Sequence, residues 1–326
     1  MSDTPAKDVE LRVAGADDAA AVLDLVGSVM GWGGDAEAAR LWRWKHVDNP
    51  SGESPTWVAV DGSGRVVGVR TFLRWRFQSA DGPRSAVRAV DTVTHPDVRG
   101  QGLFRRLTLL GLDELSGQGV DFVFNTPNDQ SRPGYLSMGW QPVRQLTVSV
   151  RPRGARGALA MVRNRVPADL ASLPVQAGLP AAEGLDDATC AVLSAAPSGV
   201  LTTLRDAAHL RWRYAGLPSL AYRVISLSRD PAEGVAVVRV RQRGAAREAT
   251  VAELSAPSAL AAARLSGAVL RQTSADYALA LPAGRPGSAG GVPVPRIGPL
   301  LVARQIASAP PPREQWRLSL GDVELF

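Results

Sequence analysis

Apolar and polar positions follow two periods in the first part of the chain, one typical of strands and one typical of helices. Residues 9–14 (VELRVA) alternate as a strand does. The carboxylates within 16–18 (ADD) can cap the amphipathic helix that the next apolar positions predict over 19–30. A glycine-rich break follows, and a second helix is expected around 37–46.

A succession of strands comes next and leads into a further helix. Strands are expected over 56–61 and 65–77, joined by the turn DGSGR, and a third strand over 85–96. The loop DVRGQG then precedes a helix over 103–119. The remaining elements are a strand over 121–127, a short helix over 132–140 and a strand over 142–150. This mixture predicts an α/β (α+β) fold for the first part of the chain.

A weak internal repeat connects the two halves of the chain. Residues 44–50 (WKHVDNP) resemble 212–218 (WRYAGLP), because each segment has a tryptophan, a basic residue, a ring and a final proline. After each segment the same order of elements is expected, namely two strands, a third strand, a helix and a fourth strand. We interpret the chain as one mixed α/β unit that has been duplicated.

The repeat suggests where the domains begin and end. The first domain is predicted over 1–150, a basic linker with a short helix over 151–170, and the second domain over 171–326. The stretch 282–299 is rich in proline and glycine and is expected to be a surface loop. A length of 326 residues agrees with two domains.

The composition is that of a globular protein rather than a fibrous, disordered or membrane-spanning one. Apolar residues make up 45% of the chain, and no apolar run reaches the roughly 18 to 20 residues that span a bilayer. The first ten residues lack the basic start and apolar stretch of a secretory signal. The single cysteine, Cys190, excludes an internal disulfide and a thiolate metal cage. We therefore expect a cytoplasmic protein without a metal site or a membrane partner.

The net charge of +6 changes this picture little. It comes from 37 basic and 31 acidic residues, and only Lys7 and Lys45 are lysines. The abundance of arginine, alanine, glycine and proline is typical of a GC-rich coding sequence. We therefore assign most basic residues to a solvated surface and do not expect a nucleic-acid partner.

The segment most specific for chemistry is 93–107 (VTHPDVRGQGLFRRL). A strand ends there, a loop holds Arg99, Gly100, Gln101 and Gly102, and a helix starts at once. The two glycines let backbone amides turn inward, and the new helix offers free N–H groups and the positive end of its dipole. This arrangement predicts a site for an anion such as a pyrophosphate, to which Arg99 can add a charged contact.

A second pattern, Asn128-x2-Ser131-x3-Tyr135-x3-Gly139-Trp140, follows further along the chain. Together the two segments resemble the GNAT acetyltransferase superfamily. Its loop pattern is Arg or Gln, two residues, Gly, one residue, Gly or Ala, and its later pattern is Asn-x2-Ala-x3-Tyr-x3-Gly-Phe. The chain departs from these patterns at Phe104 (usually Gly or Ala), Ser131 (Ala) and Trp140 (Phe). The resemblance covers about residues 9–150.

The resemblance implies a fold, a cofactor and the residues that bind it. The fold would be two GNAT-like mixed, mostly antiparallel sheets flanked by helices, with two strands splayed apart for the pantetheine arm of acetyl-CoA or another acyl-CoA. An amine of a small molecule or peptide would attack the thioester directly, without a metal. The residues that the resemblance assigns to the cofactor are Val93, Thr94, Arg99, Gly100, Gln101, Gly102, Leu103, Phe104 and Asn128.

The candidate catalytic residues serve the two proton transfers that such a reaction needs. Tyr135 stands at the family's position for the acid that protonates the departing CoA thiolate. The base is open between Asp91, His46 and His95, although a histidine before Pro96 is common there without a catalytic role. In tandem GNAT enzymes that acetylate aminoglycosides the C-terminal carboxylate can enter the active site, which adds Phe326 as a candidate.

The second half is expected to have lost this chemistry. Where the first half has RGQG, the second has a shorter loop within 257–265 (PSALAAARL), without the arginine and both glycines. No Asn-x6-Tyr-x3-Gly pattern follows its later strand. It would be a degenerate GNAT-like domain that binds no CoA and supports the acceptor site.

Two other functions remain alternatives. Fem-type ligases also use tandem GNAT-like domains, with an aminoacyl-tRNA donor, but they have little need of a CoA pyrophosphate loop. A non-catalytic acyl-CoA-binding module would bind CoA and transfer no acyl group. The identity of the acceptor, the acyl chain length and the oligomeric state do not follow from the sequence.

Overall fold

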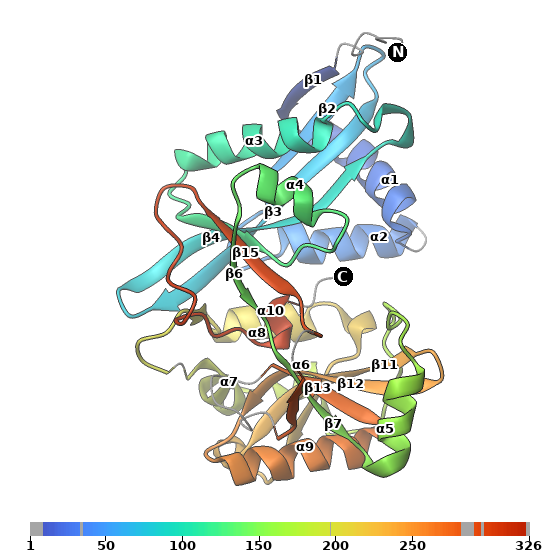
Figure 1. Cartoon of the computed structure of the whole chain (residues 1–326), viewed down its shortest axis with the longest axis vertical. Coiled ribbons are helices and arrows are strands. Elements are labelled where there is room, and N and C mark those ends of the chain that lie inside the picture. Colours follow the sequence, from blue (N-terminus) through green and yellow to red (C-terminus); the bar gives the residue numbers. More distant parts are fainter. Residues whose placement is uncertain (1–8, 33–34, 196, 282–289, 295–296, 324–326) are drawn as a thin grey trace. The chain divides into compact units, whose positions relative to one another are not determined.

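The computed structural model describes residues 9–32, 35–195, 197–281, 290–294 and 297–323 (Figure 1). They form two units, each built on a mixed sheet with helices, which confirms the predicted fold class. The first unit takes the described parts of 1–77, 84–143 and 301–311, and the second takes the described remainder. The units therefore interleave along the sequence, whereas the predicted boundaries treat each domain as one continuous segment.

The sheet of the first unit has the strand order β1–β2–β3–β4–β5–β15–β6. β4 and β5 run parallel, whereas β2 is antiparallel to β1 and β3, and β15 is antiparallel to β5. In Figure 1 the red β15, from near the end of the chain, lies beside the green β6. The strands are β1 (Val9–Val13), β2 (Thr56–Asp61), β3 (Val66–Ser79), β4 (Gly82–Thr94), β5 (Phe122–Asn125), β6 (Gln141–Gln145) and β15 (Leu300–Gln305).

Helices cover both faces of this sheet. α1 (Ala19–Met30) and α2 (Asp35–Trp42) pack on the face that carries Val58, Val69 and Val93. α3 (Leu103–Ser116) packs on the other face, where a Cβ at its Gly111 would lie 2.9 Å from Phe72 and 3.0 Å from Trp57. Because successive strand side chains alternate, Phe72 and its second neighbour Arg70 point toward α3. A polar residue in the middle of β3 or β4 therefore points either toward α1 and α2 or toward α3.

The second unit has the strand order β14–β7–β13–β12–β11–β10–β8. β12 and β13 run parallel, as β4 and β5 do, with α9 (Ala259–Thr273) between them in sequence. Its strands are β7 (Val148–Pro152), β8 (Leu179–Pro180), β10 (Arg223–Ser226), β11 (Val235–Arg243), β12 (Ala246–Ser255), β13 (Tyr277–Ala280) and β14 (Val292–Val294). Its other helices are α5 (Gly154–Arg163), α6 (Ala181–Gly184), α7 (Asp187–Ser194), α8 (Ala207–Ala215) and α10 (Leu320–Val323).

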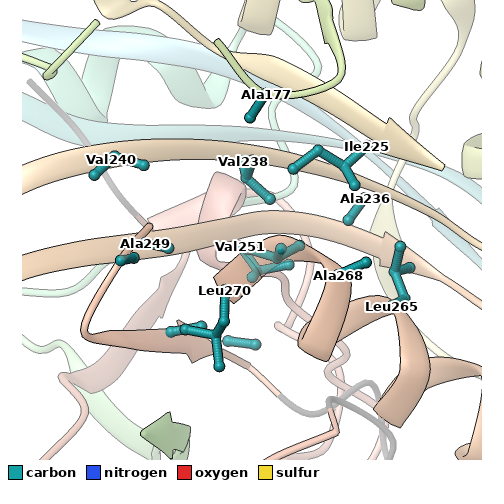
Figure 2. Close-up of a cluster of buried hydrophobic side chains, with 14 residues drawn as sticks. Ala177, Ile225, Ala236, Val238, Val240, Ala249, Val251, Leu265, Ala268 and Leu270 are labelled. Carbon is teal, nitrogen blue, oxygen red and sulfur yellow. The ribbon is translucent and has the colours of Figure 1, made fainter. Parts of the chain in front are cut away.

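The core of the second unit lies between α9 and its sheet. Figure 2 shows Leu265, Ala268 and Leu270 of α9 near valines of β11 and β12, all of them buried. The small alanines let the helix approach the strands closely, and the aliphatic side chains fill the space between them. The predicted repeat is confirmed as a repeated order of elements, since α8, β10, β11, β12, α9 and β13 follow one another here.

Two expected elements differ from the structure. The helix expected around 37–46 ends at Trp42 and continues as a π-helical turn, η2 (Arg43–Val47). The strand expected over 142–150 is two strands, β6 and β7, which belong to different sheets. The alternating pattern runs without a break across Leu146 and Thr147, so it does not reveal where the chain changes sheets. The predicted linker contains α5, and 290–294 of the expected surface loop includes β14.

No helix in the described part of the chain is long and apolar enough to cross a membrane. Within the same residues, no group of three or more His, Cys, Asp or Glu side chains is placed to hold a metal ion.

Candidate active site

The loop after β4 presents free backbone amides. A short 3-10 turn, η3 (Pro96–Val98), is followed by Arg99 and then by two glycines with left-handed backbone, Gly100 at φ 80° and Gly102 at φ 71°. α3 begins directly after Gly102, whose lack of a side chain leaves the helix without a capping group. The first amides of α3 therefore face outward without a side-chain acceptor, which is the arrangement that binds an anion.

The side chains of this loop divide into exposed and buried ones. Arg99 is exposed beside the amides and can contact an anion, whereas Leu103 is buried and can contribute only its backbone N–H. Phe104, at the position where the family pattern has Gly or Ala, packs edge-on against Tyr135 with ring centroids 5.3 Å apart. A Cβ at Gly134 would lie 2.9 Å from this ring, so Phe104 is fitted against the helix that carries Tyr135.

The strand before the loop has a free edge. β4 pairs with β5 over only three residue pairs, from Ala86 with Phe122 to Arg88 with Phe124. β4 then continues to Thr94, and in the described residues this later part has no register with β5. Its edge includes Val93 and Thr94, the positions predicted to pair with pantetheine. Backbone groups on such an edge need partners, which an extended ligand can supply.

Tyr135 lies on α4 (Arg132–Ser137) and is 5% exposed. Its hydroxyl oxygen accepts a hydrogen bond from Nη1 of Arg70, 2.9 Å away, and Arg70 also bonds the Thr92 hydroxyl. Arg70 is fully buried, and its Nε and Nη2 have no hydrogen-bond partner among the described residues. Sequence analysis missed Arg70, because it stands among other arginines of β3 and no pattern singles it out.

Asn128 positions α4 through local contacts. Its side-chain oxygen accepts hydrogen bonds from the backbone N–H and the hydroxyl of Ser131, both at 2.9 Å. Its carbonyl oxygen accepts from the backbone N–H of Arg132. The asparagine of the second motif thus sets the start of the helix that carries Tyr135. A direct contact between Asn128 and a cofactor stays a prediction.

Asp91 lies within β4 in a strained backbone conformation, with φ of 42°. Its side chain is on the α2 side of the sheet, where the Lys45 ammonium lies 2.7 Å from Oδ2 and 2.9 Å from Oδ1. Nε2 of His46 lies 2.7 Å from Oδ2. All three side chains are at most 3% exposed. Left-handed backbone at a non-glycine residue costs about 1–3 kcal/mol, and this buried ion pair holds Asp91 there.

The ion pair decides the charge of the carboxyl group. Burial by itself raises the pKa of Asp91, but the charge of Lys45 and the hydrogen bond to His46 outweigh it and lower the pKa to about 2. A carboxylate with so low a pKa is a poor acceptor of a proton from an amine. The geometry therefore argues that Asp91 orients its two neighbours rather than acting as the base. Lys45 carried a sequence signal, since it is one of two lysines in a chain rich in arginine.

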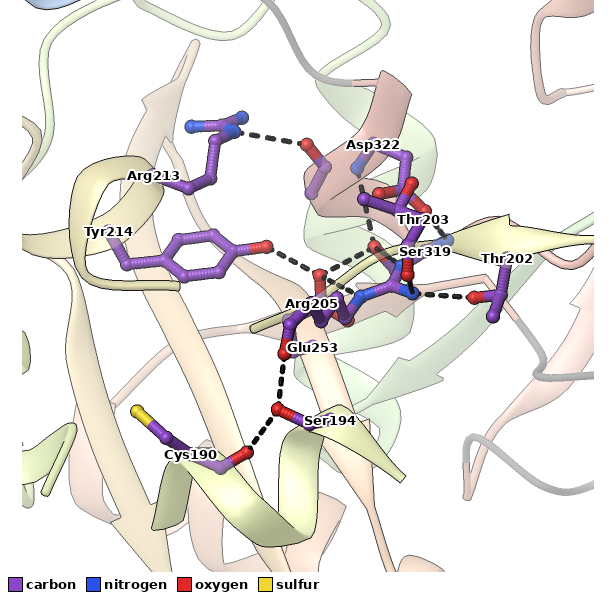
Figure 3. A network of polar contacts seen from close by, with 11 residues as sticks. Cys190, Ser194, Thr202, Thr203, Arg205, Arg213, Tyr214, Glu253, Ser319 and Asp322 are labelled. Atoms are coloured by element: carbon purple, nitrogen blue, oxygen red, sulfur yellow. Dashed lines mark hydrogen bonds and ion pairs between the residues drawn. The ribbon is translucent and has the colours of Figure 1, made fainter. Parts of the chain in front are cut away.

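The second unit contains a related polar network without the loop (Figure 3). Tyr214, in the repeat position of His46, donates to Glu253 of β12 at 2.6 Å, as His46 contacts Asp91 of β4. Arg205 lies 2.9 Å from Glu253 and 2.5 Å from Asp322. Ser258 precedes α9 as its N-cap, and its hydroxyl accepts from the N–H of Ala261, so one amide at this helix start is already capped.

The C-terminal segment belongs to this second network. α10 packs against β12, and a Cβ at Gly321 would lie 1.9 Å from the Tyr214 hydroxyl oxygen. The carbonyl oxygen of Gly321 accepts from Nε of Arg213 at 3.2 Å. Phe326, predicted as a source of a catalytic carboxylate, lies outside the described residues.

Comparisons with known proteins concern the family of the first part of the chain and the fold of the whole. Residues 10–143 match the family described as "Acetyltransferase (GNAT) domain". A search of curated protein sequences found no match. A probable N-acyltransferase from Enterococcus faecalis V583 is similar in structure, with a TM-score of 0.62 and 13% identity, over 92% of this chain and 73% of that one.

Two further solved structures have the same fold over most of the chain. A GCN5-related N-acetyltransferase from Anabaena variabilis has a TM-score of 0.59 and 12% identity, over 91% of this chain and 73% of that one. One from Kribbella flavida has a TM-score of 0.57 and 15% identity, over 94% and 73%. At these identities the likeness concerns the fold alone.

The first unit thus combines a mixed sheet, which has a free strand edge in the described residues, with a glycine loop at a helix start. Residues 10–143 of this chain match a GNAT acetyltransferase domain, so the chain contains a transferase domain.

Proposed function

We propose that this chain transfers an acyl group, most simply acetyl, from acyl-CoA to an amine of a small molecule or peptide. The observation that carries the proposal is the uncapped start of α3 after Gly100 and Gly102, beside the free edge of β4. The free amides suit the pyrophosphate of CoA, and the free edge suits the extended pantetheine arm. An enzyme that uses aminoacyl-tRNA has little need of a site for the CoA pyrophosphate.

In this proposal the loop holds the cofactor mainly through its backbone. Amides after Gly102 bind the pyrophosphate, and exposed Arg99 adds a charge-assisted hydrogen bond. The β4 backbone at Val93 and Thr94 pairs with pantetheine, while Phe104 forms a wall of the acyl pocket beside Tyr135. The acyl carbonyl then lies near Asp91, where backbone N–H groups can stabilise its developing negative charge.

Arg70 determines which way the Tyr135 hydroxyl can act. A guanidinium can only donate, so the phenol oxygen accepts from Arg70 and its own hydrogen is left for another acceptor. The CoA sulfur is that acceptor in the proposed complex. As Tyr135 gives its proton to the thiolate, the adjacent cation stabilises the charge left on the oxygen. Arg70 is thus a positioning residue and Tyr135 the proposed acid.

The proposal is tested by calorimetry with acetyl-CoA and by a thiol-release assay on a panel of amines. Arg99→Glu should weaken acetyl-CoA binding at least about tenfold, because a charged contact to a phosphate becomes a repulsion. The matched control is Arg264→Glu, the same charge change at an exposed arginine of α9, which should bind as the wild type does. A wild-type chain that binds no acyl-CoA would refute the function. Binding without thiol release for any amine would favour a non-catalytic module.

A further inference from the structure

A buried nitrogen of the first unit has no hydrogen-bond partner among the described residues. It is Nδ1 of His46, a residue that is 1% exposed. The other ring nitrogen, Nε2, contacts Asp91 at 2.7 Å. A polar atom that is buried without a partner costs free energy, about 1–3 kcal/mol, and a catalytic role is one of the reasons why a folded protein retains such an atom.

The partners of His46 decide where its proton lies. Asp91 is ionised, because Lys45 and His46 lower its pKa to about 2 against the raising effect of burial. An ionised carboxylate only accepts hydrogen bonds, so the hydrogen of the neutral ring is on Nε2. The lone pair is then on Nδ1, the atom without a partner. This is the arrangement in which a carboxylate orients a histidine as a base.

The charge of the ring is set by its surroundings. Burial lowers the pKa of His46 most, and the charge of Lys45 lowers it as well, while the hydrogen bond and charge of Asp91 raise it. The ring of Trp42 covers His46, with centroids 4.2 Å apart. The lowering effects outweigh the raising ones, so the pKa of His46 lies below its ordinary value of 6.5. His46 is therefore neutral at pH 7 and able to take up a proton.

His46 and the proposed acid, Tyr135, are held on opposite faces of the sheet. This arrangement suits an amine that attacks from one face and a CoA thiolate that departs on the other. Asp91, which holds His46, lies on the α2 side of β4. Its neighbour Thr92 bonds Arg70, which holds Tyr135 on the α3 side. The two proton-transferring groups are therefore anchored to adjacent residues of one strand but lie on opposite faces of the sheet. A thioester beside this strand would have a base on one side and an acid on the other.

We infer that His46 is the catalytic base that takes a proton from the acceptor, with Asp91 as its positioning residue, and that the acceptor is a basic alkyl amine. The inference rests on the proposed function. An alkyl amine is protonated at neutral pH, so the enzyme must supply a base that removes the proton. An arylamine is already neutral at this pH. The rings of Trp32 and Trp42, 6.4 Å apart between centroids, lie on the same side, and the Lys45 ammonium lies 5.9 Å from the Trp32 ring centroid, so this side of the sheet accommodates a cation.

The proton balance is complete with these groups. The ammonium loses one proton to Nδ1 of His46, and the free amine attacks the thioester carbonyl. As the C–N bond forms and the C–S bond breaks, the nitrogen loses its second proton to solvent and Tyr135 protonates the thiolate. Tyr135 regains a proton from water and His46 releases its own, so one proton is set free for each amide and thiol formed.

The second unit shows what the same contact looks like in a purely structural role. There the ring is Tyr214, whose single hydroxyl is used up by Glu253. A histidine in that position makes the same contact and adds a second nitrogen. The contact with the carboxylate by itself therefore does not account for Nδ1 of His46, whereas a role as a base does.

The test uses the full chain with His46→Gln, whose amide can still donate to Asp91. With an alkyl amine, kcat/KM at pH 7 should fall about 100-fold, the usual scale for a lost general base. Wild-type kcat/KM should decline below pH 6.5 as His46 becomes protonated, and this acidic limb should be absent in the variant. With an arylamine acceptor the loss should be less than about tenfold. Acyl-CoA affinity, measured by calorimetry, should not change.

Asp91→Asn tests the positioning role, since asparagine tolerates the left-handed backbone at this position. Without the carboxylate, the imidazolium loses its counter-charge, so the acidic limb should move to lower pH as kcat/KM falls. The control is His95→Gln, a half-exposed histidine of the same unit, which should keep the wild-type profile.

Several outcomes would overturn the inference. One is a His46→Gln variant that binds acyl-CoA and retains both kcat/KM and the acidic limb. Another is an equal loss with alkyl amine and arylamine, which would mean a structural role. If His46→Gln does not fold, the wild type decides, because its acidic limb must appear with the alkyl amine and disappear with the arylamine. A wild type that binds no acyl-CoA would overturn the proposed function as well.

Discussion

Tyr135 and Arg70 show how a single contact sets the role of a residue. A buried arginine without a carboxylate partner is costly, since the desolvation of the charge is not repaid by an ion pair. Here the rings of Phe72, Phe104 and Tyr135 surround the guanidinium at 4.4 to 5.8 Å. Cation–π contacts and two hydrogen bonds offset part of the cost. The arginine in turn directs the tyrosine hydroxyl.

We predict that Tyr135→Phe lowers the rate of thiol release at least about tenfold and leaves the KM for acyl-CoA nearly unchanged. The ring packing against Phe104 and Trp140 is kept, and only the hydroxyl is lost. An interaction made only in the transition state affects kcat in this way. Single-turnover kinetics measure the effect without interference from product release.

Arg70→Gln, alone and combined with Tyr135→Phe, gives a double-mutant cycle that tests how the two residues act together. If Arg70 acts through the tyrosine hydroxyl, the double variant should be no slower than the slower of the two single variants. Tyr277→Phe removes a hydroxyl that bonds Glu248 in the second unit, and it should leave thiol release unchanged. If Tyr135→Phe released the CoA thiol at the wild-type rate, Tyr135 would be a packing residue.

At the scale of elements, the start of α3 differs from the start of α9 by one cap. Gly102 offers no side chain to the first amides of α3, whereas the Ser258 hydroxyl caps one amide of α9, that of Ala261. The same helix position in the repeat therefore has no side-chain cap in one unit, where we propose that an anion binds, and has a cap in the other.

We predict that Gly102→Trp weakens acyl-CoA binding more than tenfold while the chain stays folded. No atom lies within 4 Å of a Cβ at this position, so the substitution meets no clash in the protein, but the side chain stands over the free amides. Gly64→Trp is the control, because Gly64 also has left-handed backbone and open space. Both variants pay a similar backbone cost, and calorimetry should separate them by their affinity for CoA. Equal affinities would contradict the cofactor site.

A second element-scale prediction concerns the C-terminal helix. Asp322→Ala should destabilise the chain by about 3–5 kcal/mol, because it leaves buried Arg205 with an incomplete set of partners. Asp187→Ala removes an ion pair of similar length, to Arg211, but Asp187 is 93% exposed. That control should cost less than about 1 kcal/mol. Urea unfolding measures both, and a small effect of Asp322→Ala would mean that α10 contributes little to the fold.

At the scale of the whole molecule, two sheets of similar topology carry different polar sites. Both have a parallel strand pair with a helix between the strands, and both have an acid on the strand before the helix. Within the described residues, the helix between the two parallel strands follows a glycine loop and lacks a side-chain cap in the first unit only, which also carries Tyr135. We propose that the second unit has lost cofactor binding and retains the fold.

We therefore predict one acyl-CoA bound per chain. Calorimetry on the wild type should give a stoichiometry near one, and Gly102→Trp should abolish the measurable transition rather than halve it. Ser258→Gly, which removes the cap of α9, should leave the stoichiometry at one, since the second loop also lacks the arginine. Two equivalent sites would contradict the degeneracy of the second unit.

The sequence by itself determined the class of fold, the repeated order of elements and the glycine loop, while phosphate binding by that loop stays a prediction. These depend on local patterns, such as the alternation in 65–77 or the two glycines before the helix at Leu103, and local patterns report the backbone conformation of their own residues. Tertiary structure alone decided that β6 and β7 join different sheets. It also brought Lys45 and His46 to Asp91, and Arg70 to Tyr135. Those pairings join residues 45 to 65 positions apart, and burial and strand register, which no local pattern encodes, determine which side chains meet.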